Sequence, residues 1–275
     1  RKSQRKIFYN INKDAKSIIQ IFKIHNVNKI YNETILQLEE CILSAHIIPK
    51  NNRIERLRRF RCGKRYCPIC SFFKTRVEIA KFYKTYQKLK LKPEFKNAEF
   101  RLLTLKLAPH EIYETHSKTG FINHALRKFL NYKLPKNQTQ IDNGFKGKSF
   151  TEMLLGSSKF LHVGFNNSHN QAVVHVHLVL FLKPGFTSNE RITDMMIFKR
   201  WEKATKSSDC YAHIQPITDT QQDAIDTMSY GLKTLNVASA KKYPAKFLKL
   251  MGTLHGQRTF SHTKEVRTTR AEINK

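Results

Sequence analysis

The chain has 275 residues, enough for one large domain or two smaller ones, and 40% of them are hydrophobic, which suffices for a packed core. Lysine and arginine outnumber aspartate and glutamate by 50 to 21, and the resulting net charge of +29 favours a polyanionic partner such as nucleic acid. With no apolar run near 20 residues and no secretory signal, we expect no membrane partner. The five cysteines, an odd number with three crowded together, indicate a reducing compartment and hence a cytoplasmic location.

The first half of the chain alternates between helical patterns and a basic stretch. Apolar residues recur at helical spacing over residues 14–48 and again over 77–91, with a basic, cysteine-containing stretch at 50–70 between them. Residues 100–107 alternate apolar and polar side chains, which predicts a strand, and residues 121–132 are expected to form a helix.

The second half favours strands connected by hairpins and by helices. After a polar loop at 135–148, the expected elements are, in order, strands at 160–165 and 172–182 around a turn at 166–170, a helix at 192–204, a strand at 211–217, a helix at 220–235 and a basic, poorly patterned tail. This order predicts an α+β fold with a central antiparallel sheet and flanking helices.

A cysteine cluster lies in the basic stretch. Cys62, Cys67 and Cys70 have C-x4-C-x2-C spacing, which is typical of a structural zinc site that holds a polar loop together. Cys41 is the best fourth ligand because Cys210 lies far away beside a predicted strand, and the weaker substitute is His46. Basic residues around the cluster are expected to face DNA phosphates, although a solvated basic face is the simpler alternative: Arg53, Arg56, Arg58, Arg59, Arg61, Lys64 and Arg65.

Two histidines flank one valine in the predicted strand at 172–182. Side chains two apart on a strand point the same way, so His175 and His177 project together and could bind a divalent metal. The alternative is a pair of hydrogen-bonded histidines on a half-buried sheet. If the hairpin turns between residues 168 and 169, His162 lies directly opposite His175 and supplies a third ligand. His169 in the turn is the competing third ligand, and a register slip of one residue would turn His162 to the other face.

The predicted helix at 220–235 has a polar flank. Asp226, Tyr230 and Lys233 fall within about 60° of arc, apart from an apolar face, although a partly buried tyrosine on an amphipathic helix is the simpler alternative. A tyrosine hydroxyl can attack a phosphodiester and form a covalent intermediate. A metal ion at the histidines would polarise the phosphate, Lys233 would add positive charge, and Asp226 could activate a water or a second hydroxyl. Three imidazoles suit Mn²⁺, Zn²⁺, Co²⁺ or Ni²⁺ better than Mg²⁺.

These segments together resemble the replication initiator (Rep) proteins of rolling-circle plasmids, in the HUH endonuclease superfamily, from about residue 57 to 264. Val173 stands where many relatives have a further histidine, and His162 where they commonly have a glutamate. Asp226 stands where some relatives have a glutamate that activates water at termination. The resemblance rests on the cysteine-rich segment ending in Arg76 (FRCGKRYCPICSFFKTR), the strand FRLLTLKL, the histidine strand AVVHVHLVLF, Tyr230 with Lys233, and the segment GQRTFS at 256–261.

The resemblance implies nicking of one strand at a plasmid origin, with Tyr230 linked to the 5′ phosphate and a free 3′-OH left for a polymerase. It implies Mn²⁺ or Mg²⁺ at the histidines, single-stranded or hairpin origin DNA as substrate, and a host helicase and polymerase as partners. It also implies a central antiparallel sheet in which the histidine strand and the tyrosine helix face one another. The domains expected on this basis are a helical accessory region (1–55), a zinc-binding basic segment with its connecting helix (56–95), an HUH nuclease domain (96–265) and a basic tail (266–275).

Three alternative functions are consistent with part of the pattern. A relaxase or single-tyrosine transposase uses the same chemistry on other DNA, but the cysteine segment argues against both. A non-catalytic zinc-containing DNA-binding protein explains the charge and the cysteines but leaves the histidine strand without a role. An RNA-binding or ribosome-associated protein explains the charge alone.

Overall fold

The computed structural model describes residues 2–48, 53–56, 62–64, 66–132, 149–166, 171–184, 194–217, 237–254 and 260–273. The chain divides into two compact units, the first comprising Arg1–Val77 with Thr234–His255 and the second Glu78–Lys233 with Gly256–Lys275. Residues 234–255, which the resemblance assigned to the expected nuclease domain (96–265), belong to the first unit. None of the helices in the described ranges is long and apolar enough to cross a membrane.

The first unit is mainly helical. Its helices α1 (Lys2–Ile24) and α2 (Asn32–Ser44) pack on each other, and α8 (Val237–Lys242), which precedes α9 (Pro244–Thr253), packs on α1. Two short strands, β1 (Ala45–Ile48) and β2 (Arg53–Arg56), form an antiparallel pair. The apolar side of α1 is buried, with Ile18 and Phe22 each at most 2% exposed.

The continuous helix predicted over residues 14–48 is wrong in two places. The chain leaves the helix after Ile24 and makes a 3-10 turn, η1 (Val27–Lys29), in which Asn28 and Lys29 have φ of 55° and 60°. A left-handed backbone at two successive residues cannot continue a right-handed helix, and asparagine tolerates that conformation better than most residues. Residues 45–48 form β1 instead of the last helical turn.

Helix α3 (Pro68–Lys90) extends from the cysteine segment into the second unit. It begins earlier than the helix predicted at 77–91, because Pro68 occupies the first helical position, where its fixed φ suits the helix and its missing N–H is no loss. A 3-10 turn, η2 (Pro93–Phe95), follows and leads into the sheet.

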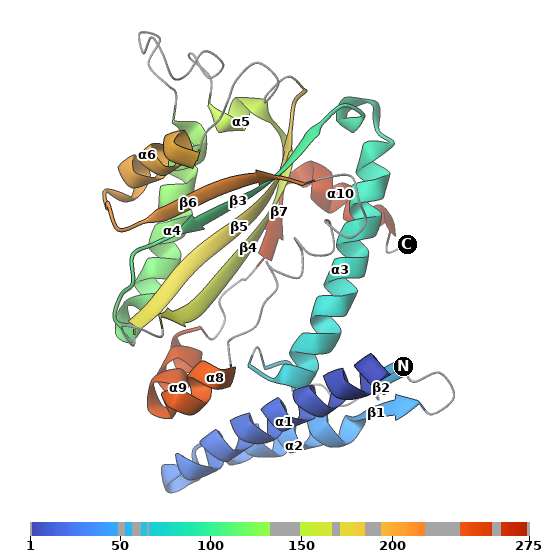
Figure 1. Cartoon of the computed structure of the whole chain (residues 1–275), viewed down its shortest axis with the longest axis vertical. Helices are drawn as coiled ribbons and strands as arrows, with labels where there is room; N and C mark the ends of the chain where they lie inside the picture. The colour runs from blue at the N-terminus through green and yellow to red at the C-terminus, as the bar shows by residue number, and fades with distance from the viewer. Residues whose placement is uncertain are drawn as a thin grey trace. The chain divides into compact units, whose positions relative to one another are not determined.

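The second unit is built on a five-stranded antiparallel sheet in the order β6-β3-β5-β4-β7 (Figure 1). This sheet and its helices confirm the α+β class. The strands are β3 (Glu99–Lys106), β4 (Leu154–Asn166), β5 (Gln171–Leu182), β6 (Tyr211–Pro216) and β7 (Phe260–His262). In the described part of this unit, the helical elements that accompany α3 are the 3-10 turn η3 (Ile112–Glu114), α4 (Thr115–Asn131), α5 (Phe150–Met153), α6 (Asp194–Thr205) and α10 (Lys264–Ile273).

One face of the sheet is covered by α4 and α6 (Figure 1). Lys159 of β4 donates from Nζ to Asn123 of α4 at 2.7 Å, and the Nε1 of Trp201 in α6 donates to the backbone oxygen of Lys106 at 3.0 Å. Trp201 and Leu103 are fully buried in this layer. The aliphatic residues of the central strands therefore form a core against these two helices.

Among the residues that the structure describes, helices pack on the other face at one end. There α3 and α10 cover the aromatic and aliphatic residues of the strands, including Phe100, Phe160 and Phe181. Because residues two apart on a strand share a face, the histidines of β4 and β5 lie on this same face, further along the strands.

The expected basic tail at 266–275 is instead helical through Ile273. Val266 and Thr269 of α10 are at most 1% exposed, and three-residue spacing places them on one side of the helix. Most other residues of α10 are charged or polar, so two buried positions were too few to predict a helix from the sequence.

Candidate functional site

The β4–β5 hairpin brings His162 and His175 together. The two residues are directly paired between β4 and β5. This is the register expected for a hairpin that turns between residues 168 and 169, so that prediction is confirmed. Their nitrogens Nδ1 of His162 and Nε2 of His175 are 2.6 Å apart. The ring of His177 lies 4.9 Å from that of His175 between centroids, on the same face.

The third histidine is held by a hydroxyl from the neighbouring strand. His177 is 1% exposed, and its Nδ1 lies 3.0 Å from Oγ1 of Thr104, which is directly opposite on β3. A hydrogen bond to one ring nitrogen fixes the ring orientation and favours one tautomer, so that the other nitrogen faces a defined direction.

The environment keeps His175 uncharged. Burial of the ring and, after it, the positive charges of His162, His177 and Lys106 lower the pKa of His175 to about 2. A neutral imidazole retains the lone pair that a metal ion needs. Two nitrogens on one ion lie roughly 3 Å apart, given metal–nitrogen bonds of about 2.1 Å, so the His162–His175 pair fits a divalent ion with little movement.

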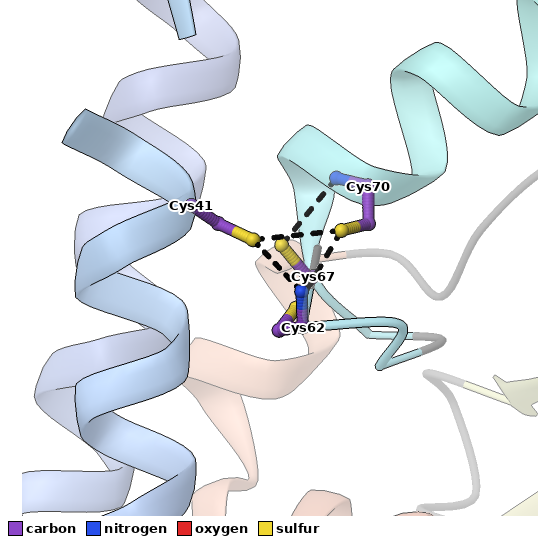
Figure 2. Close-up of side chains that lie close together, drawn as sticks. All are labelled: Cys41, Cys62, Cys67 and Cys70. Atoms are coloured by element: carbon purple, nitrogen blue, oxygen red, sulfur yellow. Dashed lines mark hydrogen bonds between the residues drawn. The ribbon is translucent and has the colours of Figure 1, made fainter. Parts of the chain in front are cut away.

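Four cysteines of the first unit form a second centre (Figure 2). Cys41 comes from α2, Cys62 and Cys67 precede α3, and Cys70 lies in its first turn. Sγ of Cys70 is 3.5 Å from that of Cys41 and 3.6 Å from that of Cys62, and all four sulfurs lie within 4.8 Å of one another. Sulfurs around a tetrahedral zinc ion are about 3.8 Å apart, so this group could hold structural zinc, with Cys41 as the fourth member.

Backbone contacts support this interpretation. The amide nitrogens of Cys62 and Cys70 donate to Sγ of Cys41 and Cys67 at 3.2 and 3.4 Å, contacts that stabilise thiolates. Hydrogen bonds from Cys41, Cys62 and Cys67 lower the pKa of Cys70, whereas the hydrogen bond with Cys41 is the largest cause that raises the pKa of Cys67. Gly63 turns the loop at φ 66°, a conformation that suits glycine.

Several predicted site residues lie outside the described residues, and their proposed roles stay predictions: Asp226, Tyr230, Lys233, His169, Arg58, Arg59, Arg61 and Arg65. The same holds for the side chain of His46. Of the other expected DNA contacts, Lys64 is half-buried, and Arg76 is exposed with its guanidinium 5.3 Å from the Phe72 ring centre. Cys210 belongs to the second unit, apart from the four-cysteine group.

Two residues of β3 were missed by the sequence patterns. Thr104 bonds His177, and Lys106 lies directly opposite His175. The alternation of residues 100–107 already placed both on one polar face. What the alternation alone left open was the pairing of this strand with the histidine strand.

Comparison with protein-family models matches residues 55–275 to a family described as Replication protein. The comparisons with curated proteins and with solved structures found no match.

Proposed function

Because the chain belongs to the Replication protein family, whose members initiate plasmid replication, we propose that it nicks one strand of a plasmid origin and starts rolling-circle replication. The observation that carries the proposal is the 2.6 Å approach of His162 to His175, with His177 beside them on the same face of the sheet. The family match favours this function over the relaxase and transposase alternatives.

The three imidazoles would hold Mn²⁺ or Mg²⁺, with His162, His175 and His177 as ligands. A divalent ion bound there supplies electrostatic polarisation of the scissile phosphate. The burial that keeps His175 neutral also lowers the local dielectric, so that charges brought near it interact more strongly than they do in water.

Tyr230 is the proposed nucleophile. Its hydroxyl loses a proton as the oxygen bonds to phosphorus, the bond from phosphorus to the 3′ oxygen breaks, and that oxygen takes up a proton. The products are a 5′-phosphotyrosine and a free 3′-OH, which a host polymerase extends while a host helicase separates the strands. Lys233 adds positive charge near the phosphate, and Asp226 activates the water or hydroxyl that releases the covalent intermediate.

The four-cysteine group is proposed to hold zinc and to fix the loop that presents basic residues to origin DNA. A structural zinc ion replaces the core that such a short polar segment lacks. The contacts proposed with DNA phosphates are Arg58, Arg59, Arg61, Lys64, Arg65 and Arg76. We propose that the protein acts in the cytoplasm, on plasmid DNA.

A nicking assay on origin DNA tests the proposal. Supercoiled plasmid carrying the origin is incubated with the full chain and Mn²⁺, and the same plasmid with a scrambled origin is the control. We expect nicked circles from the first plasmid only. If the chain binds origin DNA but leaves it intact with Mn²⁺, Mg²⁺, Co²⁺ and Ni²⁺, the proposal is wrong. The chain would then be a non-catalytic zinc-containing DNA-binding protein.

A further inference from the structure

A row of side chains continues from the histidines to the edge of the sheet. Lys106 of β3 is directly opposite His175 on one side and Tyr211 of β6 on the other. Directly paired residues of antiparallel strands share a face, so Tyr211, Lys106, His175 and His162 form one row across four strands.

A second row runs parallel to the first, one step along the strands. His213 of β6 is directly opposite Thr104, which in turn is opposite His177. Nδ1 of His213 lies 2.8 Å from Oδ2 of Asp194, so a carboxylate fixes the orientation of this imidazole. The rings of Tyr211 and His213 are 6.5 Å apart between centroids, at 35°.

The outer end of the first row is open to solvent. Tyr211 is 50% exposed, unlike the aromatic residues of the same face that α3 and α10 cover. An aromatic ring exposed on a rigid strand offers a flat apolar surface at little conformational cost.

Lys106 is a cation without a counterion in the part of the chain that the structure describes. Other basic residues of the same unit are paired, such as Lys88 with Glu272 and Arg270 with Glu78. The backbone oxygen of Lys106 accepts from Trp201, while its half-buried side chain belongs to the histidine face. A half-buried cation directly opposite His175 attracts an anion.

We propose that Lys106 and Tyr211 form a nucleotide subsite for single-stranded DNA beside the histidines. Lys106 binds a backbone phosphate, and Tyr211 stacks on an unpaired base. This inference rests on the proposed function, which brings a DNA strand to the histidines. A duplex keeps its bases stacked on each other, so only an unpaired base offers Tyr211 a free face.

Binding of single-stranded DNA by the full chain tests the subsite. Fluorescence anisotropy with a labelled oligonucleotide of mixed sequence, in buffer without added divalent metal, measures affinity over a series of salt concentrations. Lys106→Gln should weaken binding and reduce the slope of log affinity against log salt by about 0.7, the value for one phosphate contact on a single strand. Lys106→Arg should restore both.

Tyr211→Ala should weaken binding of the single strand roughly tenfold with an unchanged salt slope, because stacking is not an ionic contact. Tyr211→Phe should retain the affinity. Matched controls lie on α4, across the sheet from the subsite: Lys128→Gln removes the same charge, and Phe121→Ala removes an exposed aromatic ring. Both controls should bind as the unchanged chain does.

Wild-type affinity and salt slope in both Lys106→Gln and Tyr211→Ala would overturn the inference. Equal losses for the single strand and for the duplex of the same sequence would overturn the assignment to single strands. Nicking of origin plasmid by the unchanged chain is measured in parallel. If the unchanged chain nicks the plasmid but the variants bind DNA as it does, the subsite is wrong and the proposed nicking function stands. If the variants lose binding as predicted but the unchanged chain does not nick the plasmid, the subsite is supported and the nicking function is wrong.

Discussion

Nδ1 of His162 lies 2.6 Å from Nε2 of His175, and the backbone ladder between β4 and β5 holds the two residues at paired positions. Two ring nitrogens at this distance cannot both carry a proton, so they share one or bind a common ion. Strand pairing, which involves many backbone hydrogen bonds, therefore sets the spacing of the proposed metal ligands.

Removal of His162 should weaken Mn²⁺ binding by more than tenfold, since even loss of a residue that only supports a ligand typically costs 10–100-fold. Isothermal titration of His162→Ala with Mn²⁺ measures the effect, and His124→Ala, an exposed histidine on α4, is the control. Unchanged affinity in His162→Ala would transfer the ligand role to His169.

Thr104→Val should lower Mn²⁺ affinity and nicking by roughly 10–100-fold, because it removes the hydroxyl that lies 3.0 Å from Nδ1 of His177 while keeping the side-chain shape. Thr104→Ser keeps the hydroxyl and should lose little. Metal titration and nicking rates are measured on both variants. Equal behaviour of valine and serine would show that the hydroxyl does not support the metal site.

The histidine pairing was predictable because it depends on local rules. Alternation identified the two strands, and the polar turn between them fixed the register that places His162 opposite His175. Partners from distant strands were not predictable in this way. Thr104 is 73 positions from His177, and neither periodicity nor turn chemistry specifies which strand adds to the outside of a hairpin.

We expect about one zinc ion per chain in the unchanged protein and a loss of this zinc in Cys67→Ser. Three thiolates in so polar a segment bind zinc far more weakly than four. Elemental analysis of the purified chain measures zinc, and thermal unfolding should shift to lower temperature. Cys210→Ser is the control, since this buried cysteine lies outside the four-cysteine group. Undiminished zinc in Cys67→Ser would remove the zinc assignment.

Trp201→Ala should lower the free energy of unfolding by about 3–5 kcal/mol, because it leaves a large cavity under the sheet and removes the hydrogen bond from Nε1 to the backbone oxygen of Lys106. Chemical denaturation measures the loss, with the exposed Phe121→Ala as the comparison. A loss below about 1 kcal/mol would contradict the packing of α6 on this face.

The errors at the helix ends have two different physical origins. Apolar spacing continues through residues 25–31, but the positive φ of Asn28 and Lys29 interrupts the helix there. In α10 the reverse holds, since two buried residues among many charged ones suffice to dock a short helix that composition alone describes as a tail. Tertiary packing outweighs local propensity in α10.

Covalent attachment of DNA to Tyr230 is the central claim, and label transfer tests it most directly. A single-stranded origin oligonucleotide, labelled on the 3′ side of the nick, is incubated with the full chain and Mn²⁺ and separated on a denaturing gel. We predict a labelled protein band for the unchanged chain and for Tyr113→Phe, and none for Tyr230→Phe. A labelled band of equal intensity in Tyr230→Phe would contradict the proposed nucleophile.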